Sequence, residues 1–271
     1  MRSRRASRKQ KQNLGYWIAL VLGVLIISGF GVTGIVLSLD QRPTDRLSGC
    51  PTDGYDSVTA VLVDLTDPIN PVQAAALRNA LMRIRNEVPQ FGRLEIYPLE
   101  SATTTTIAPL FSGCSPGNGR DVSNKFYGNP DLADRIWRQQ FGERVDAIIE
   151  QIEKLPAQAN SPLLEGIQSV AVTAFGVPMA ESARDKRLII VSDMIHNGSS
   201  LSMYNGAPSF DQFALGSYFP TIRPDLRGAR VDVFLIVRDT RRMVQTPALY
   251  KFWVDYAARA NGYLTNWEPV Q

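Results

Sequence analysis

The chain has few of the residues on which metal centres and disulfide scaffolds depend. Its 271 residues include only two cysteines and one histidine. These numbers argue against a zinc site and exclude a disulfide-dense mini-protein. No acidic residue precedes Asp40, and no charged residue occurs within residues 15–39. The composition of the whole chain, 44% hydrophobic and 20% charged, is that of a globular protein, and its length fits one domain with an additional segment.

The basic residues are unevenly distributed. Six of the 29 lie before residue 12, so the rest of the chain carries 23 basic against 26 acidic residues, a net charge of −3. The folded part therefore lacks the excess of positive charge that nucleic-acid binding requires, and we expect no nucleic acid partner.

Residues 15–39 form a continuous apolar run. The run exceeds the roughly 20 residues that a helix needs to cross a bilayer core. A cleaved signal peptide is the alternative, but its apolar core spans about 7–15 residues and is followed by small residues at the cleavage site. We therefore predict a transmembrane helix over residues 15–39. The basic tail, residues 1–14, then stays in the cytoplasm by the positive-inside rule. Everything after Leu39 lies outside the cytoplasm, with a bacterial inner membrane and periplasm as the expected location.

The two cysteines, Cys50 and Cys114, both follow the predicted span. An oxidising compartment outside the cytoplasm permits a disulfide between them, and that disulfide would close a long loop. We expect the two to pair, with two free thiols as the alternative.

The exported part divides into a linker, residues 40–55, and one α/β domain, residues 56–271. Short apolar runs alternate with stretches that have apolar residues at helical spacing. Strands joined through helices pair in parallel by right-handed crossovers, so we predict an open, mostly parallel, doubly wound sheet with helices on both faces. The predicted strands are residues 58–63, 94–99, 103–111 (at an edge), 187–192, 231–237 and 263–267, the predicted helices are residues 71–88, 131–155, 162–175 and 248–261, and the predicted loops are residues 112–129 and 196–224.

Polar side chains follow two of the predicted strands. Asp64, Thr66 and Asp67 follow the first strand, and Asp193 follows a later apolar strand. Ser161 begins a helix that lies between them in the sequence. Ligands bind beyond the carboxyl ends of the strands in such sheets. Carboxylate and hydroxyl oxygens form a hard ligand set suited to Mg²⁺ or Mn²⁺.

Three stretches of the chain resemble the von Willebrand factor A family, a resemblance that extends over roughly residues 56–267. They are Val61-Leu-Val-Asp64-Leu-Thr66, Ser161-Pro-Leu-Leu-Glu-Gly-Ile167 and Arg187-Leu-Ile-Ile-Val-Ser-Asp193. In that family the first strand ends in Asp-x-Ser-x-Ser, a Thr precedes a central helix, and a later strand ends in Thr-Asp or Ser-Asp. Together these residues form a metal-ion-dependent adhesion site.

The resemblance implies that Asp64, Thr66, Ser161 and Asp193 hold a divalent metal. The chain departs from the family at Pro68, which stands where the second Ser of the first motif belongs and has no side-chain oxygen. The neighbouring Asp67 could replace that ligand. Because the family's metal takes an acidic side chain of a partner, the resemblance implies protein binding and not catalysis.

Each residue of this set also has an ordinary structural interpretation. Asp64 and Asp193 can cap a loop or the next helix, and Ser161 before Pro162 fits an N-cap. His196 lies in a turn-like His-Asn-Gly-Ser stretch and has no second histidine as a partner.

Three functional hypotheses follow. The first is a single-pass membrane protein whose exported domain binds a protein partner through a divalent metal. The second is a metal-free scaffold that uses the loops over residues 112–129 and 196–224. The third is a haloacid-dehalogenase-like phosphatase, which requires a second Asp at the position of Thr66.

Overall fold

The computed structural model describes residues 17, 20–28, 42–64, 66–100, 106–122, 128–154 and 158–270. The chain divides into two compact units, Met1–Pro43 and Thr44–Gln271. In the first unit, the described residues 17 and 20–28 are helical. Among the described residues, no helix combines the length and the apolar character needed to cross a membrane. The rest of the predicted span lies outside the described residues. The same holds for Leu155, the last residue of the predicted helix 131–155, and for residues 103–105 of the predicted edge strand.

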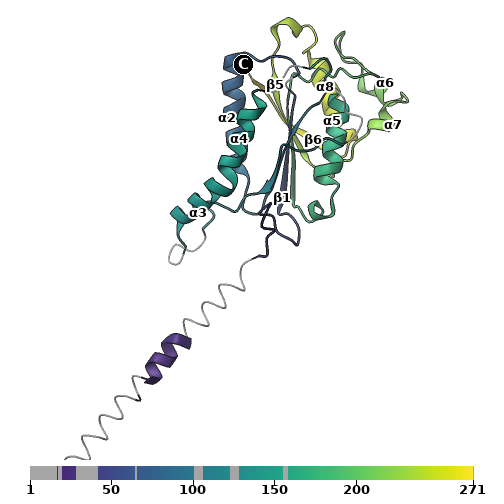
Figure 1. Cartoon of the computed structure of the whole chain (residues 1–271). Helices are drawn as coiled ribbons and strands as arrows, with labels where there is room; N and C mark the ends of the chain where they lie inside the picture. The colour runs from purple at the N-terminus through teal and green to yellow at the C-terminus, as the bar shows by residue number, and fades with distance from the viewer. Residues whose placement is uncertain are drawn as a thin grey trace, which may run out of the picture. The chain divides into compact units, whose positions relative to one another are not determined.

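The second unit is built on one sheet, which in the described part of the chain has six strands in the order β3-β2-β1-β4-β5-β6 (Figure 1). β3 runs antiparallel to β2, and every other neighbouring pair is parallel. The order is that of a doubly wound sheet, so the predicted open, mostly parallel sheet is confirmed. The strands are β1 (Ser57–Val63), β2 (Arg93–Pro98), β3 (Phe111–Cys114), β4 (Asp185–Ser192), β5 (Arg230–Ile236) and β6 (Tyr263–Val270).

Helices cover both faces of the sheet (Figure 1). α2 and α4 pack on one face, and α5 and α8 pack on the other. Neighbouring residues of β1 alternate between the two cores: Val61 faces α2 and α4, and Leu62 faces α5 and α8. A strand buried on both faces carries apolar residues at successive positions, which explains the apolar run Ala60–Val63 of β1. The helices are α2 (Pro71–Glu87), α3 (Pro130–Trp137), α4 (Glu143–Ile152), α5 (Leu163–Val170), α6 (Phe210–Ala214), α7 (Phe219–Ile222) and α8 (Pro247–Arg259).

The start of α2 shows how the local sequence determines where a helix begins. Asn70 is the N-cap of α2: its side chain accepts from the N–H of Gln73, whose side chain in turn accepts from the N–H of Asn70. Pro71 occupies the first turn, where its missing N–H costs nothing. This reciprocal capping fixes the start of α2 directly after the loop that leaves β1.

Several predicted elements differ from the structure. The edge strand begins at Phe111, so residues 112–114 belong to β3 and not to a loop, because Phe111 packs on Phe141 with ring centroids 5.7 Å apart. The predicted helix over residues 131–155 contains a π-helical turn, Arg138–Gly142, between α3 and α4. The predicted loop over residues 196–224 contains α6 and α7, because the phenylalanines of α6 pack on Phe252 of α8 and Phe219 of α7 packs on Tyr256 of the same helix.

Most of the predicted linker is part of the domain. The compact unit begins at Thr44, whereas the predicted domain begins at residue 56. Thr44 and Pro51 form an isolated β-bridge, and the carbonyl of Ser48 accepts from the N–H of Cys114 at 2.9 Å. Cys50 and Tyr55 are buried. The segment that precedes β1 therefore packs along the edge strand β3.

Candidate functional site

Asp64 follows β1 at the carboxyl ends of the parallel strands and is 2% exposed. Its Oδ1 accepts from the backbone N–H of Thr66 at 3.2 Å. Its Oδ2 accepts from the hydroxyls of Ser161 and Ser192, both at 2.7 Å. The Asp64 carboxylate thus joins the loop after β1, the end of β4 and the segment before α5. The predicted meeting of Asp64 and Ser161 is observed, and Ser192 joins them.

Ser161 does not act as the predicted helix cap. α5 begins at Leu163, its N-cap is Pro162, and no side chain caps it. Ser161 instead forms a backbone bridge with Asn197, with N–H···O distances of 3.0 and 2.8 Å. Its hydroxyl donates to Asp64, because a buried carboxylate is a stronger acceptor than a neutral group.

The loop between β1 and α2 contributes backbone atoms to the site. The N–H of Thr66 donates to Asp64, and the carbonyl of Thr66 accepts from the N–H of Gln158 at 2.8 Å. Asp67 is half-buried, and its carbonyl accepts from Arg238 Nη2 at 3.0 Å. Both predicted ligand residues are therefore next to Asp64, in a loop held by hydrogen bonds to the backbone.

Asp193 follows Ser192 at the end of β4 and is 7% exposed. Its Oδ1 accepts from the N–H of Ile195 at 2.9 Å. Burial and the neighbouring carboxylate of Asp64 raise the pKa of Asp193 to about 7, against the opposing effects of the Ile195 N–H and Arg238. A nearby positive charge favours the ionised form of a second carboxylate so close to Asp64.

Arg238, which sequence analysis missed, supplies that charge. It follows β5, and its Nε lies 3.6 Å from Asp193 Oδ2. Its Nη1 donates to the carbonyl of Pro68, next to the Nη2 bond to Asp67. The sequence does place Arg238 directly after the predicted strand 231–237, at the same end of the sheet as Asp64 and Asp193.

Gln245 holds Arg238 in this position. The Gln245 side chain donates to the carbonyls of Asp193 at 3.0 Å and Ile236 at 2.9 Å, and it accepts from the N–H of Arg238 at 2.8 Å. The loops after β1, β4 and β5 are thus tied together. We call this group the carboxyl-end site; its side chains are Asp64, Ser161, Ser192, Asp193 and Arg238.

His196 is part of the interior next to this site, with no exposed surface. Its Nδ1 accepts from the N–H of Leu164 at 3.4 Å and lies 3.9 Å from Glu165 Oε2. Burial lowers the pKa of His196 to about 4, although Glu165 and Asp64 oppose this shift. The histidine is therefore neutral near pH 7 and is not an exposed base.

Residues 113–117, Gly-Cys-Ser-Pro-Gly, match the G-x-S-x-G pattern of a hydrolase nucleophile elbow, which sequence reasoning overlooked. Such an elbow places its Ser between a strand and a helix. Here Ser115 follows the antiparallel strand β3, is fully buried, and accepts from the N–H of Gly117 at 3.3 Å. Ser115 lies at the amino ends of the parallel strands and His196 at their carboxyl ends. The two do not form a catalytic pair.

The carboxyl-end site does not match the metal site that the resemblance implies. Pro68 lacks a side-chain oxygen, and the Arg238 guanidinium lies against Asp193 and the Asp67 and Pro68 carbonyls. Within the described ranges, no group of three or more His, Cys, Asp or Glu could hold a metal ion. We assign no metal-dependent step to these residues.

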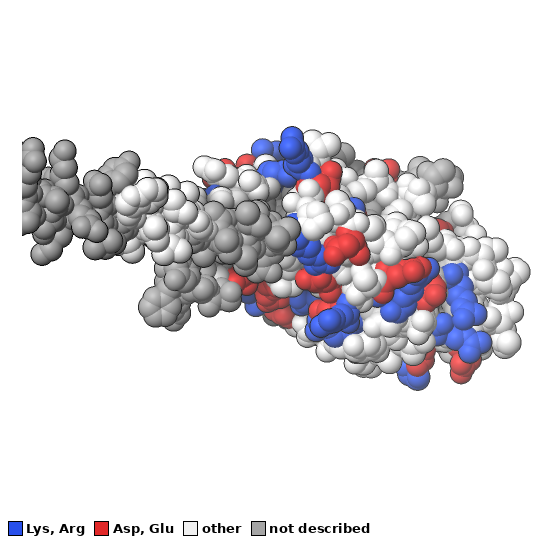
Figure 2. Space-filling model, turned by 90° about the horizontal axis from the view of Figure 1, so that it is seen from below, with Lys and Arg blue, Asp and Glu red and all other residues white. Residues whose placement is uncertain are grey.

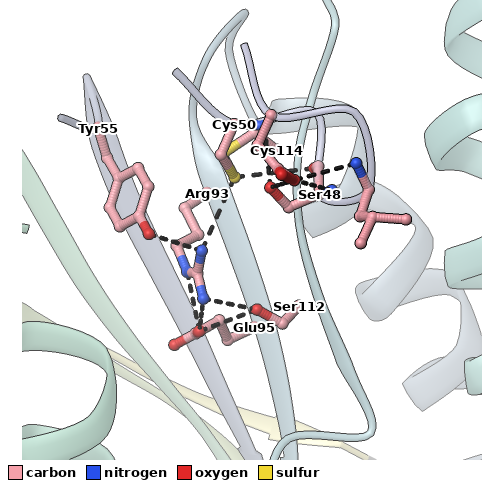
Figure 3. The surroundings of a disulfide bond; sticks show 9 residues. Ser48, Cys50, Tyr55, Arg93, Glu95, Ser112 and Cys114 are labelled. Carbon is pink, nitrogen blue, oxygen red and sulfur yellow. Dashed lines mark hydrogen bonds and ion pairs between the residues drawn. A yellow bond between two sulfur atoms is a disulfide. The ribbon is translucent and has the colours of Figure 1, made fainter. Parts of the chain in front are cut away.

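The amino ends of the strands hold a second cluster (Figure 3). Cys50 and Cys114 form the expected disulfide. Arg93 lies beside it: Nη1 donates to the Tyr55 hydroxyl at 2.7 Å, and Nε and Nη2 donate to Glu95 Oε1 at 2.8 and 2.6 Å. We call these five residues the amino-end cluster.

The view from below shows Lys and Arg interspersed with Asp and Glu (Figure 2). A nucleic-acid-binding face typically gathers one sign of charge in a stripe or patch. The mixture on this face therefore gives no support to a nucleic acid partner.

Comparison with known proteins gives structural similarity alone. No family model matches the sequence, and the search of curated proteins finds no match. A crystal structure of the SpRpn10 VWA domain has 13% identity and a TM-score of 0.39, over 79% of this chain and 89% of that chain. The human COPII-coat protein Sec24c has 8% identity and a TM-score of 0.40, over 81% of this chain and 31% of that chain. The pilus adhesin SpaC from Lactobacillus rhamnosus GG has 11% identity and a TM-score of 0.33, over 54% of this chain and 16% of that chain.

Proposed function

We propose that this chain is a single-pass membrane protein whose exported, von Willebrand factor A-like domain binds a protein partner and catalyses no reaction. The observation that favours this proposal over the phosphatase is the closed environment of Asp64. Its oxygens already accept hydrogen bonds from Thr66, Ser161 and Ser192, and it is 2% exposed. A phosphatase nucleophile needs a carboxylate oxygen that the substrate can reach, and the position for its second Asp is the buried Thr66.

The loops supply the exposed surface that a partner would contact. Met243, in the loop between β5 and α8, is 91% exposed, and Leu215, between α6 and α7, is 90% exposed. Recognition residues are commonly carried on loops held by a rigid sheet. We propose these two loops as the contact surface, which develops the metal-free hypothesis for the loop over residues 196–224.

The membrane anchor and the location are part of the same proposal. The uncharged run over residues 15–39 and the six basic residues before it support a cytoplasmic N-terminus. The Cys50–Cys114 disulfide supports an oxidising compartment for the domain, such as a bacterial periplasm.

Site-specific crosslinking tests the contact surface. A photo-reactive phenylalanine analogue is introduced at Met243 or Leu215 in the full chain in its native cells. Tyr263, which is 51% exposed and lies at the amino end of β6, is the matched control. We expect one protein adduct of the same mass from Met243 and Leu215 and none from Tyr263. Adducts of equal yield at all three positions, or none at any, would contradict the proposal.

Membrane extraction tests the anchor. We expect the full chain to stay in the membrane fraction through an alkaline wash. Replacing both Leu25 and Ile26 by Arg should release it, because charged side chains are costly at the bilayer centre. A wild-type chain released by the wash would contradict the anchor while leaving the crosslinking result intact.

A further inference from the structure

Arg238 lies against Asp193, one of the residues that the resemblance assigns to a metal ion, and against the loop that follows Asp64. Its guanidinium contacts the carbonyls of Asp67 and Pro68 on one side, and its Nε is 3.6 Å from Asp193 Oδ2 on the other. The Arg238 side chain is 12% exposed. A cation coordinated by the loops after β1 and β4 would have to share this space with the guanidinium and would be repelled by its charge.

The position of Arg238 is built into the fold. Gln245 accepts from its N–H and donates to the carbonyl of Asp193, so the backbone of the arginine is tied to the residue whose carboxylate it faces. Hydrogen bonds within the chain therefore hold the backbone of Arg238. The ordered loop is a consequence of hydrogen bonds within the chain, whereas a metal site draws its order from coordination.

The electrostatics of the site favour a positive charge. Asp64 and Asp193 are both buried, and Asp193 has no hydroxyl donor comparable to Ser161 and Ser192 among its contacts in the described chain. Buried charges in proteins are paired or coordinate a metal. An arginine, which stays charged at every ordinary pH, meets this need permanently.

We propose that the guanidinium of Arg238 replaces the divalent cation of the adhesion-type site, so that the carboxyl end of this sheet carries a built-in positive charge and needs no metal. The proposal concerns the chain alone, and its test involves no partner. Its failure is therefore distinguishable from failure of the proposed binding function.

The first test is metal titration of the purified full chain in detergent. We expect no saturable heat with Mg²⁺ or Mn²⁺ at millimolar concentration, and the same melting temperature in Mg²⁺ and in EDTA. Saturable binding that disappears in Asp64→Ala would overturn the proposal. This measurement uses the wild-type chain, so it holds even if the variants below fail to fold.

The second test is a charge-compensation series. Arg238→Ala should lower the melting temperature by roughly 5–15 °C, because it leaves Asp193 buried without a counter-charge. Arg238→Lys, which keeps the charge, should lose less. Adding Asp193→Asn to Arg238→Ala should recover more than half of the loss, because the uncompensated charge is then gone.

Arg242→Ala is the matched control. Arg242 lies in the same loop and pairs with Asp239, but its side chain is 73% exposed. We expect its removal to leave the melting temperature nearly unchanged. An Arg238→Ala loss no larger than that of Arg242→Ala, or a double variant no more stable than Arg238→Ala, would overturn the proposal.

Discussion

The two ends of the sheet each hold a buried carboxylate beside an arginine, but the two pairs are made differently. In the amino-end cluster, Glu95 is 2% exposed and accepts two N–H groups of Arg93, together with the Tyr97 hydroxyl at 2.6 Å. In the carboxyl-end site, Arg238 Nε stays 3.6 Å from Asp193 and has no hydrogen-bond partner among the described residues.

The Arg93–Glu95 pair is closed by hydrogen bonds, whereas the Arg238–Asp193 pair leaves one N–H, that of Arg238 Nε, without a hydrogen-bond partner among the described residues. A buried ion pair stabilises a fold only when its geometry is good and its remaining polar atoms are satisfied. The Arg93–Glu95 pair meets that condition, and the adjacent disulfide closes the same region. Arg238 Nε has no hydrogen-bond partner in the described part of the chain, at the end of the sheet where ligands bind in α/β folds.

The largest expected effect comes from breaking the amino-end pair. Arg93→Ala leaves Glu95 buried and without its counter-charge, and we expect the free energy of unfolding to fall by about 3–5 kcal/mol. Urea unfolding of the full chain, followed by tryptophan fluorescence, measures this loss.

Arg230→Ala is the control for that variant. Arg230 pairs with Asp185 at the same end of the sheet, but their side chains are 40% and 52% exposed. We expect a loss below about 1 kcal/mol. Equal losses of unfolding free energy for Arg93→Ala and Arg230→Ala would mean that the closed geometry around Glu95 does not contribute to stability.

The disulfide is the next largest contribution at the amino end. It joins residues 64 positions apart, so its removal frees a long loop in the unfolded chain. We expect the Cys50→Ser/Cys114→Ser variant to lose about 2–4 kcal/mol of unfolding free energy. Reductant should lower the stability of the wild type to the same level and leave the variant unchanged. A variant as stable as the oxidised wild type would contradict this role.

At the carboxyl end, the expected effect depends on pH. The folded chain holds the pKa of His196 at about 4, below the ordinary value of 6.5. As pH falls from about 7 to 4, the unfolded chain therefore binds a proton that the folded chain rejects. The contribution of His196 to the free energy of unfolding should fall by roughly 2–3 kcal/mol over this window. Asp193, whose pKa is raised to about 7, binds its proton in the folded chain over the same window and acts in the opposite direction. Glu165 and Asp64 face the imidazole and limit the effect.

His196→Gln isolates this dependence. His196 is the only histidine, so the difference between the wild-type and variant stability curves reports that imidazole alone. We expect the two curves to converge as pH falls toward 4. Stability curves that stay parallel between pH 7 and 4 would show that burial does not lower the pKa of His196.

The sequence is most informative where burial is most complete. β1, β4 and β5 are covered on both faces, so their apolar runs predict them directly. β3 was placed wrongly because Phe-Ser-Gly-Cys has no such pattern; pairing with β2 and the disulfide define it. Tertiary contacts of this kind leave little trace in local sequence.

The site was predictable to the same extent. Asp64 and Asp193 follow from the rule that parallel strands bring their carboxyl ends together. Ser161 follows from the resemblance. The role of Arg238 does not, because it depends on β5 lying beside β4 and on the course of the following loop. A search for a metal site looks for side-chain oxygen ligands, and it therefore misses an arginine such as Arg238.

The smallest effect separates the two hydroxyls of the carboxyl-end site. Ser192 donates to Asp64 and also accepts from the N–H of Met194 at 2.9 Å, where Met194 has a φ of 61°. Ser161 donates to the same carboxylate oxygen at the same distance of 2.7 Å. We expect Ser192→Ala to cost about 2 kcal/mol and Ser161→Ala about 1 kcal/mol of unfolding free energy, because the first variant also leaves the Met194 N–H unpaired. Equal losses of unfolding free energy for the two variants, measured by urea unfolding, would show that the left-handed turn at Met194 needs no support from Ser192. The hydrogen bonds to Asp64 would then be the shared contribution of the two hydroxyls.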